Sequence, residues 1–408
     1  MLKKFIAFII ITIFLSGCSY IDNITQQKEN NFEEYTLGED EVNTNDNTEK
    51  TANEIKSEYI SKLIADMTIE EKVGQMFMLA WRKDDKGNNI TSINDDIISD
   101  INYIKPVGVI LFGENIDTEE QTKEFIESLQ EQSKISLFMG IDEEGGRVSR
   151  LHYSGNIDTP QIPSAQQMEQ SGNPIEAENN MAIIAKEISK LGFNVDFAPV
   201  ADINTNPENT VIGDRAFGST PEVVSEFVVS AINGLQKNNI SSCVKHFPGH
   251  GDTYTDTHTT ETFVEHDITR LENCELIPFE EAIQNNVDFI MASHIKVPNV
   301  DKSNLPTSLS KTMISKLLRE YMGFDKIVIT DALDMGAITD YYTDEEIAQY
   351  GIDADIDIFL MPKNPNILYD YILNGVKKGI ISEERINKSV ERILEVKYNR
   401  GLLDLKNE

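Results

Sequence analysis

Eight short apolar runs alternate along the chain with segments that have the apolar spacing of amphipathic helices. The runs are residues 74–80, 107–112, 135–141, 195–202, 240–245, 287–293, 326–331 and 356–361. Runs that are apolar at nearly every position are typical of parallel strands covered on both faces. This number of strands in about 350 residues predicts an α/β fold, a (β/α)8 TIM-type barrel, with a doubly wound open sheet as the alternative.

Polar residues follow several of these runs at the point where the run ends. Asp142, Asp202, Lys245, Ser293 and Asp331 each lie at or just after the carboxyl end of an expected strand. In a barrel these strand ends meet at one rim, where barrel enzymes assemble their active sites. The convergence favours the barrel and predicts a site at that rim.

The amino-terminal residues have the pattern of an export signal. Lys3 and Lys4 precede an apolar run over residues 5–15, which is too short for a stable membrane span. The run closes on LSGC, which resembles a bacterial lipobox. We expect residues 1–17 to be a lipoprotein signal peptide and Cys18 to become an acylated, extracytoplasmic N-terminus anchored to the cell membrane. An ordinary secretory signal is the alternative.

The residues after Cys18 are rich in Asn, Glu, Asp and Thr and carry no apolar periodicity. We therefore expect residues 18–54 to be a disordered acidic tether. The last amphipathic segment, with Ser382 as its N-cap, leaves little chain after it. Residues 55–408 are therefore expected to form a single catalytic domain.

The charge balance limits the partners that the chain can bind. Lys and Arg number 36 against 69 Asp and Glu, a formal net charge of −33. Such a surface repels nucleic-acid phosphates and anionic lipid headgroups. We expect a monomer that binds no nucleic acid and meets the membrane only through its lipid anchor. Cys243 and Cys274 suggest neither a disulfide framework nor a zinc knuckle.

The stretch KHFPGHGDTYTDTHT contains three of the six histidines and could be a metal site or a proton-transfer device. His246 and His250 have the spacing of a helical zinc motif, but Pro248 lies between them and excludes a continuous helix. A metal site on a loop, built with His258 and Asp252, stays open as an alternative.

Asp256-Thr257-His258 suggests the second possibility. On an extended segment the side chains of residues i and i+2 project to the same side, so the carboxylate can lie beside the imidazole. A neighbouring carboxylate fixes the tautomer of a histidine and favours its protonated form. His258 could therefore act as an acid near neutral pH, although such triplets are common in solvated loops.

Taken together, the motifs resemble glycoside hydrolase family 3, in its β-N-acetylglucosaminidase branch. The matching blocks, in order, are MTIEEKVGQMF, IDEEGGRVSRL, IGDRAFG, KHFPGHGDTYTDTH, VITDALDMGAI and RINKSVERILEVKY. They extend over about residues 55–403. The lipobox and the tether are similar to those of lipid-anchored bacterial members of the branch.

The resemblance implies a retaining glycosidase on a (β/α)8 barrel that needs neither a metal nor an organic cofactor. Asp331 matches the nucleophile of the family, with Asp334 as an alternative. His258 matches an acid/base that is a histidine on a loop, and Asp256 would orient and charge it.

The resemblance also implies a set of sugar-binding residues. They are Asp142, Arg150, Arg215, Lys245 and His246. Ser293 and His294, at another strand end, are expected to support the site from behind. Arg147 is expected instead to form an internal ion pair with Glu143 or Glu144.

The expected function is the removal of terminal β-linked N-acetylglucosamine, with peptidoglycan fragments as the expected substrate because the protein would lie outside the cytoplasm. Two alternatives stay open. A phosphorylase would use the same covalent intermediate with phosphate as acceptor. A lipid-anchored glycan-binding protein would have no activity, although the chain carries both Asp331 and the Asp256–His258 pair.

Overall fold

The computed structural model describes residues 51–154, 156–253 and 261–403. The expected signal peptide, Cys18, Asp256 and His258 lie outside these ranges. The first described helix, α2, begins at Ala52, so the last residues of the segment expected to be a tether are helical. Within the described ranges, no helix has both the length and the apolar character that crossing a bilayer requires.

Eight parallel strands in the described part of the chain form one sheet. They are β1 (Phe77–Leu79), β2 (Gly108–Ile110), β3 (Phe138–Ile141), β6 (Val195–Asp196), β7 (Ser241–Phe247), β9 (Phe289–Ala292), β11 (Ile327–Thr330) and β12 (Phe359–Leu360). Strand β1 pairs with both β2 and β12, and a parallel bridge between Ile329 and Ile358 joins the two edges of the sheet. The predicted (β/α)8 barrel is confirmed, and the open-sheet alternative is wrong.

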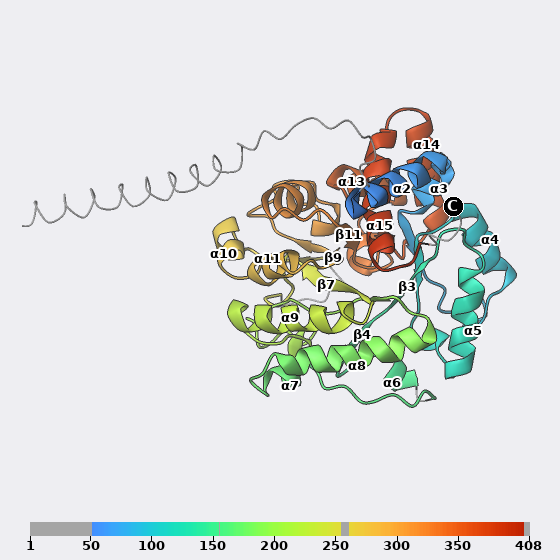
Figure 1. The fold of residues 1–408 in the computed structure, drawn as a ribbon. Helices are drawn as coiled ribbons and strands as arrows, with labels where there is room; N and C mark the ends of the chain where they lie inside the picture. Colours follow the sequence, from blue (N-terminus) through green and yellow to red (C-terminus); the bar gives the residue numbers. More distant parts are fainter. Residues whose placement is uncertain (1–50, 155, 254–260, 404–408) are drawn as a thin grey trace, which may run out of the picture. The chain divides into compact units, whose positions relative to one another are not determined.

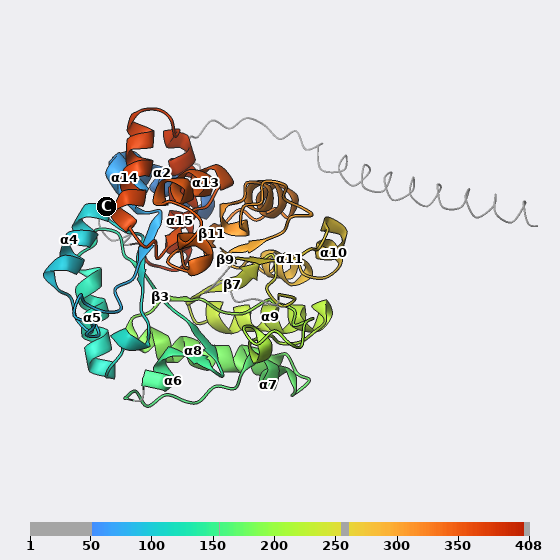
Figure 2. The same cartoon turned by 180° about the vertical axis from the view of Figure 1, so that it is seen from behind.

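Helices surround this sheet (Figures 1 and 2). They include α2 (Ala52–Asp66), α3 (Ile69–Gly74), α4 (Asp95–Ile104), α5 (Glu119–Gln130), α8 (Ile175–Leu191), α9 (Pro221–Gln236), α11 (Ile277–Gln284), the π-helix η4 (Thr312–Tyr321), α13 (Asp344–Ala354), α14 (Pro365–Lys377) and α15 (Glu383–Asn399). Ser382 caps α15 as predicted, because its side chain accepts a hydrogen bond from the N–H of Arg385.

Short elements lie in the connections. The helices are η1 (Gly113–Asn115), α6 (Arg150–Ser154), α7 (Ala165–Glu169), η2 (Gly213–Arg215), α10 (Ile268–Asn273), η3 (Thr307–Leu309) and α12 (Gly336–Thr339). The strands are β4 (Glu143–Gly145) paired with β5 (Val148–Ser149), and β8 (Thr262–Phe263) paired with β10 (Ile295–Lys296).

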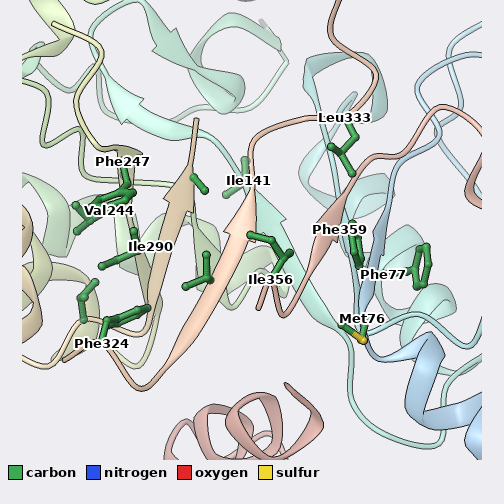
Figure 3. Close-up of a cluster of buried hydrophobic side chains, with 14 of the residues drawn as sticks. Met76, Phe77, Ile141, Val244, Phe247, Ile290, Phe324, Leu333, Ile356 and Phe359 are labelled. Carbon is green, nitrogen blue, oxygen red and sulfur yellow. The ribbon is translucent and has the colours of Figure 1, made fainter. Parts of the chain in front are cut away.

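The barrel strands bury side chains on both faces, as their continuous apolar character predicted. Phe289 and Met291 belong to the cluster inside the barrel, where the ring centroids of Phe289 and Phe138 lie 5.2 Å apart. Ile290, between them in sequence, belongs to the layer that packs against the helices. Figure 3 shows part of that outer layer, including Phe77 and Ile290.

Helix α15 covers the amino ends of the strands. Its side chains Ile393 and Val396 join the cluster inside the barrel, and Lys397 is fully buried beside them. The Lys397 ammonium contacts the carbonyl oxygen of Val107 at 3.1 Å and Gln75 Oε1 at 3.3 Å. This end of the barrel is therefore packed, and the opposite end is left to form a site.

Candidate active site

A cavity of about 270 Å³ lies at the carboxyl ends of the barrel strands. Its wall includes the predicted nucleophile and all of the predicted sugar-binding residues, but not Asp202 or Ser293. The predicted residues in the wall are Asp142, Arg150, Arg215, Lys245, His246 and Asp331. The barrel therefore brings together side chains from segments as far apart in sequence as β3 and β11. Asp256 and His258, the other predicted catalytic residues, lie outside the described residues.

Asp331 directly follows β11 and faces the cavity. Its N–H donates to the carbonyl oxygen of Ala292 at 2.8 Å, which continues the pairing of β11 with β9. Its Oδ1 accepts from the N–H of Ala332 at 2.8 Å. Asp334, the alternative nucleophile, is exposed and does not line the cavity.

His294 supports the segment that carries Asp331. One ring nitrogen, Nε2, lies 2.9 Å from the carbonyl oxygen of Ala332, and Nδ1 lies 2.8 Å from the hydroxyl of Ser308. Because a carbonyl oxygen only accepts, Nε2 carries a proton, while Nδ1 shares its hydrogen bond with a hydroxyl that can donate or accept. These contacts agree with the expectation that His294 supports the site from behind.

Lys245 forms the centre of a buried charge network. Its ammonium lies 2.9 Å from Asp142 Oδ1 and 2.7 Å from Glu144 Oε1. Burial alone would lower the pKa of Lys245, but the two carboxylates outweigh it and raise that pKa. Burial likewise opposes the charge on Asp142, but Lys245 and Arg150 hold its pKa below the usual range. The network is therefore ionised at neutral pH.

Glu144 links Lys245 to Arg215, two of the three cationic residues of the described cavity wall. Arg215 donates to its two carboxylate oxygens through Nε and Nη2, each at 2.8 Å, while Lys245 binds one of the same oxygens. Burial opposes the charge of Glu144, but Arg215 and Lys245 hold its pKa well below the usual range. The DEE run of the IDEEGGRVSRL block suggested Glu144 only as a possible partner of Arg147, and no local pattern indicated its contacts with Lys245 and Arg215.

Arg147 has a different partner from the one expected. Its Nε donates to Asp214 at 2.8 Å, and its Nη2 donates to the carbonyl oxygens of Thr210, Val211 and Ile212 at 2.7–3.0 Å. The expected ion pair with Glu143 or Glu144 is wrong, because the β4–β5 turn directs Arg147 toward the loop that precedes Arg215. Arg147 therefore holds a loop that forms part of the cavity wall.

Glu143 faces away from the cavity and fixes the turn that carries Arg150. Its Oε2 accepts from the N–H groups of Arg150 and Leu151 at 2.8 and 3.1 Å, and its Oε1 accepts from the Ser149 hydroxyl. Burial raises the pKa of Glu143 to about 7. Arg150 then reaches Asp142 Oδ2 at 3.1 Å.

The sequence profile of the glycosyl hydrolase family 3 N-terminal domain matches residues 68–396. The chain belongs to glycosyl hydrolase family 3. Beta-hexosaminidase A of Pseudoalteromonas piscicida is 30% identical to this family 3 chain over 371 residues, which are 81% of this chain and 61% of that protein. Beta-hexosaminidase LpqI of Mycobacterium tuberculosis is 30% identical over 299 residues, 71% of this chain and 76% of that protein.

A solved family 3 structure has the same fold. A glycoside hydrolase family 3 beta-N-acetylglucosaminidase from Paenibacillus sp. str. FPU-7 matches with a TM-score of 0.77 and 35% identity. The match covers 84% of this chain and 65% of that one. The family 3 chain thus spans less than two thirds of the Paenibacillus enzyme and of the Pseudoalteromonas enzyme.

Proposed function

We propose that the protein is a retaining exo-β-N-acetylglucosaminidase with Asp331 as its nucleophile. The observation that carries the proposal is the position of Asp331 in the same cavity as the network of Asp142, Lys245 and Glu144. The beta-hexosaminidases and the beta-N-acetylglucosaminidase to which the chain is similar support the choice of sugar.

The polar wall of the cavity suits a sugar ligand. The Asp142 carboxylate can accept hydrogen bonds from hydroxyls, while Lys245 and Arg215 offer donors whose positions are fixed by their ion pairs. Because these groups are already paired before a ligand enters, little side-chain freedom is lost on binding.

In the proposed reaction Asp331 attacks the anomeric carbon and forms a glycosyl ester as the bond to the leaving oxygen breaks. His258, oriented by Asp256, gives its proton to that oxygen. The neutral His258 then takes a proton from water, which attacks the anomeric carbon, releases the sugar with β configuration retained and regenerates the Asp331 carboxylate.

We further propose that Cys18 carries the lipid anchor, that the enzyme acts as a monomer outside the cytoplasm, and that its natural substrates are peptidoglycan fragments. The net charge of −33 favours small soluble fragments over anionic wall polymers. Replacement of Cys18 by serine should move the protein from the membrane fraction to the soluble fraction. Retention of the serine variant in the membrane would contradict the anchor.

The activity is tested with aryl β-glycosides of N-acetylglucosamine and of glucose, each with and without phosphate. We expect the N-acetylglucosaminide to be cleaved faster, with free sugar as product in both buffers. Asp331→Asn should reduce kcat by at least about a thousandfold, because the ester cannot form. The matched control Asp334→Asn should keep its activity, since Asp334 is exposed and outside the cavity.

Three results would overturn parts of this proposal. Near-normal activity of Asp331→Asn would exclude it as the nucleophile. Faster cleavage of the glucoside would change the substrate, and a sugar phosphate formed in the phosphate buffer would make the enzyme a phosphorylase.

A further inference from the structure

The Asp202 carboxylate lies behind the cavity wall and holds the KHFPGH turn at two points. It is fully buried, and its Oδ1 accepts from the N–H groups of His246 and His250 at 3.2 and 2.7 Å. Its Oδ2 lies 2.7 Å from Nδ1 of the His246 ring. The residue after this turn packs closely on the segment that follows β6, because a Cβ on Gly251 would lie 1.8 Å from the carbonyl oxygen of Ile203.

These contacts determine which nitrogen of His246 carries the proton. The Asp202 carboxylate accepts two backbone N–H groups, and such hydrogen bonds favour its ionised form. The ionised carboxylate only accepts, so the proton lies on Nδ1 of His246. On the other side of the ring, Nε2 lies 3.4 Å from Nη2 of Arg215, which only donates. A proton on Nε2 would set two donors against each other, whereas a lone pair there can accept from Arg215.

An acceptor at this nitrogen complements the cations of the cavity. Lys245 and Arg215 offer only donors, and the nearby acceptors Asp142 and Glu144 are already paired with them. A sugar hydroxyl that accepts a hydrogen bond from one of them can donate its own proton to Nε2 of His246. If the hydroxyl were missing or blocked by an acyl or alkyl group, the lone pair would stay buried without a donor, which is costly.

We propose that Asp202 is a positioning residue that makes His246 a hydrogen-bond acceptor and thereby makes the site select a sugar with a free hydroxyl opposite Nε2. The part that concerns the sugar rests on the proposed function. The part that concerns the tautomer does not, so the two can fail separately.

The tautomer is tested first in the wild-type protein. Long-range proton–nitrogen spectra of protein labelled with ¹⁵N-histidine distinguish the two neutral tautomers and the imidazolium, and the His246 signals are those missing in His246→Gln. We expect the neutral Nδ1–H tautomer at pH 7.5. Either the Nε2–H tautomer or the imidazolium would overturn the proposal, whatever the activity of the protein.

Asp202→Asn then tests the cause. The asparagine oxygen is expected to keep the two backbone N–H groups, so that its NH2 faces Nδ1 and the proton of His246 moves to Nε2. The matched control is Asp196→Asn, because Asp196 is also fully buried but binds the N–H of Glu143 instead of a histidine. The His246 signals should stay unchanged in the control. An unchanged tautomer in Asp202→Asn, or an equal change in both variants, would contradict the role of Asp202.

The consequence for selectivity is tested with singly deoxygenated aryl N-acetylglucosaminides. One of these substrates lacks the hydroxyl that would lie opposite Nε2 of His246. The wild-type enzyme should cleave that substrate with a kcat/KM at least about tenfold lower than that of the parent glycoside. In Asp202→Asn the same removal should change kcat/KM less than about twofold, because Nε2 no longer accepts. Equal losses in both proteins would overturn the selectivity. A wild-type protein that cleaves none of the parent glycosides would instead overturn the proposed function and leave the tautomer result standing.

Discussion

Lys245 at the carboxyl ends of the strands and Lys397 at their amino ends are both buried, but their surroundings differ. Lys245 has two carboxylates within 2.9 Å. Lys397 contacts a carbonyl oxygen, an amide oxygen and, at 4.9 Å, the face of the Phe138 ring. The carboxylates raise the pKa of Lys245, whereas burial lowers the pKa of Lys397 to about 7.

Lys245 is a buried charge that carboxylates stabilise beside the cavity, whereas Lys397 is a buried charge without such a partner among the described residues. Two ions can stay charged in a protein interior only if each has a well-placed partner, because the desolvation of an unpaired charge is costly. At the cavity those partners are also the groups that would bind a sugar. At the closed end the barrel gives Lys397 two oxygen atoms and no carboxylate among the described residues, so the amine is easily neutralised.

The largest effect is expected for Lys245→Met. Asp142 and Glu144 would lose the cation between them and stay buried, which should lower the free energy of unfolding by about 3–5 kcal/mol. Because the cavity wall would also lose a donor, kcat/KM should fall at least about a hundredfold. Urea unfolding and hydrolysis of an aryl N-acetylglucosaminide measure the two effects.

A surface pair gives the control for this variant. The ammonium of Lys134, whose side chain is 88% exposed, lies 3.0 Å from Glu71, so Lys134→Met should cost less than about 1 kcal/mol. Similar losses of unfolding free energy in Lys245→Met and Lys134→Met would show that the buried network stabilises the protein no more than a surface ion pair does.

Lys397→Met should change the free energy of unfolding in the opposite direction from Lys245→Met. An unbranched apolar side chain of similar length removes the desolvated charge, and the protein should become more stable by about 1–4 kcal/mol at pH 6–7 with kcat/KM unchanged. Since the pKa of Lys397 is lower in the folded state than in the unfolded chain, its penalty is complete below pH 7 and disappears as the pH rises toward about 10.4. The difference in unfolding free energy between variant and wild type should therefore shrink between pH 7 and 10. A constant difference over that range would contradict the lowered pKa.

The sequence predicted the barrel, and it predicted the residues at the carboxyl ends of the strands better than those at the amino ends. The strands are apolar on both faces, so their runs stand out, and Asp142, Lys245 and Asp331 lie where strands end. The partners that set their charges were harder to see, because Lys245 meets Asp142 across 103 residues and Arg215 meets Glu144 across 71. Such pairings follow from the closure of the barrel and leave no local pattern.

The surroundings of Lys397 are a second feature that the local sequence did not predict. In the run VERILEVKYNR Lys397 follows Ile393 by four residues and Leu394 by three, so helical spacing places it on the apolar face, although a lysine there usually extends its ammonium to solvent. The apolar face of α15, with Ile386, Val390, Ile393 and Leu394, is buried. Lys397 lies on the same face and its ammonium is covered as well, because α15 crosses the end of the barrel. Periodicity gives the face but not what covers the ammonium.

The smallest expected effect is the coupling energy between a lysine and one of its partners. In a double-mutant cycle, Gln75→Leu with Lys397→Met should give a coupling energy of about 0.5–1 kcal/mol, because one hydrogen bond of 3.3 Å joins the two side chains. The corresponding cycle of Glu144→Gln with Lys245→Met should give at least about 2 kcal/mol, because it joins two buried opposite charges 2.7 Å apart. Urea unfolding at pH 7 measures all six variants. If the two coupling energies were equal, the carboxylates at the cavity would add nothing to what neutral oxygens provide at the closed end, and the contrast between the two lysines would rest on burial alone.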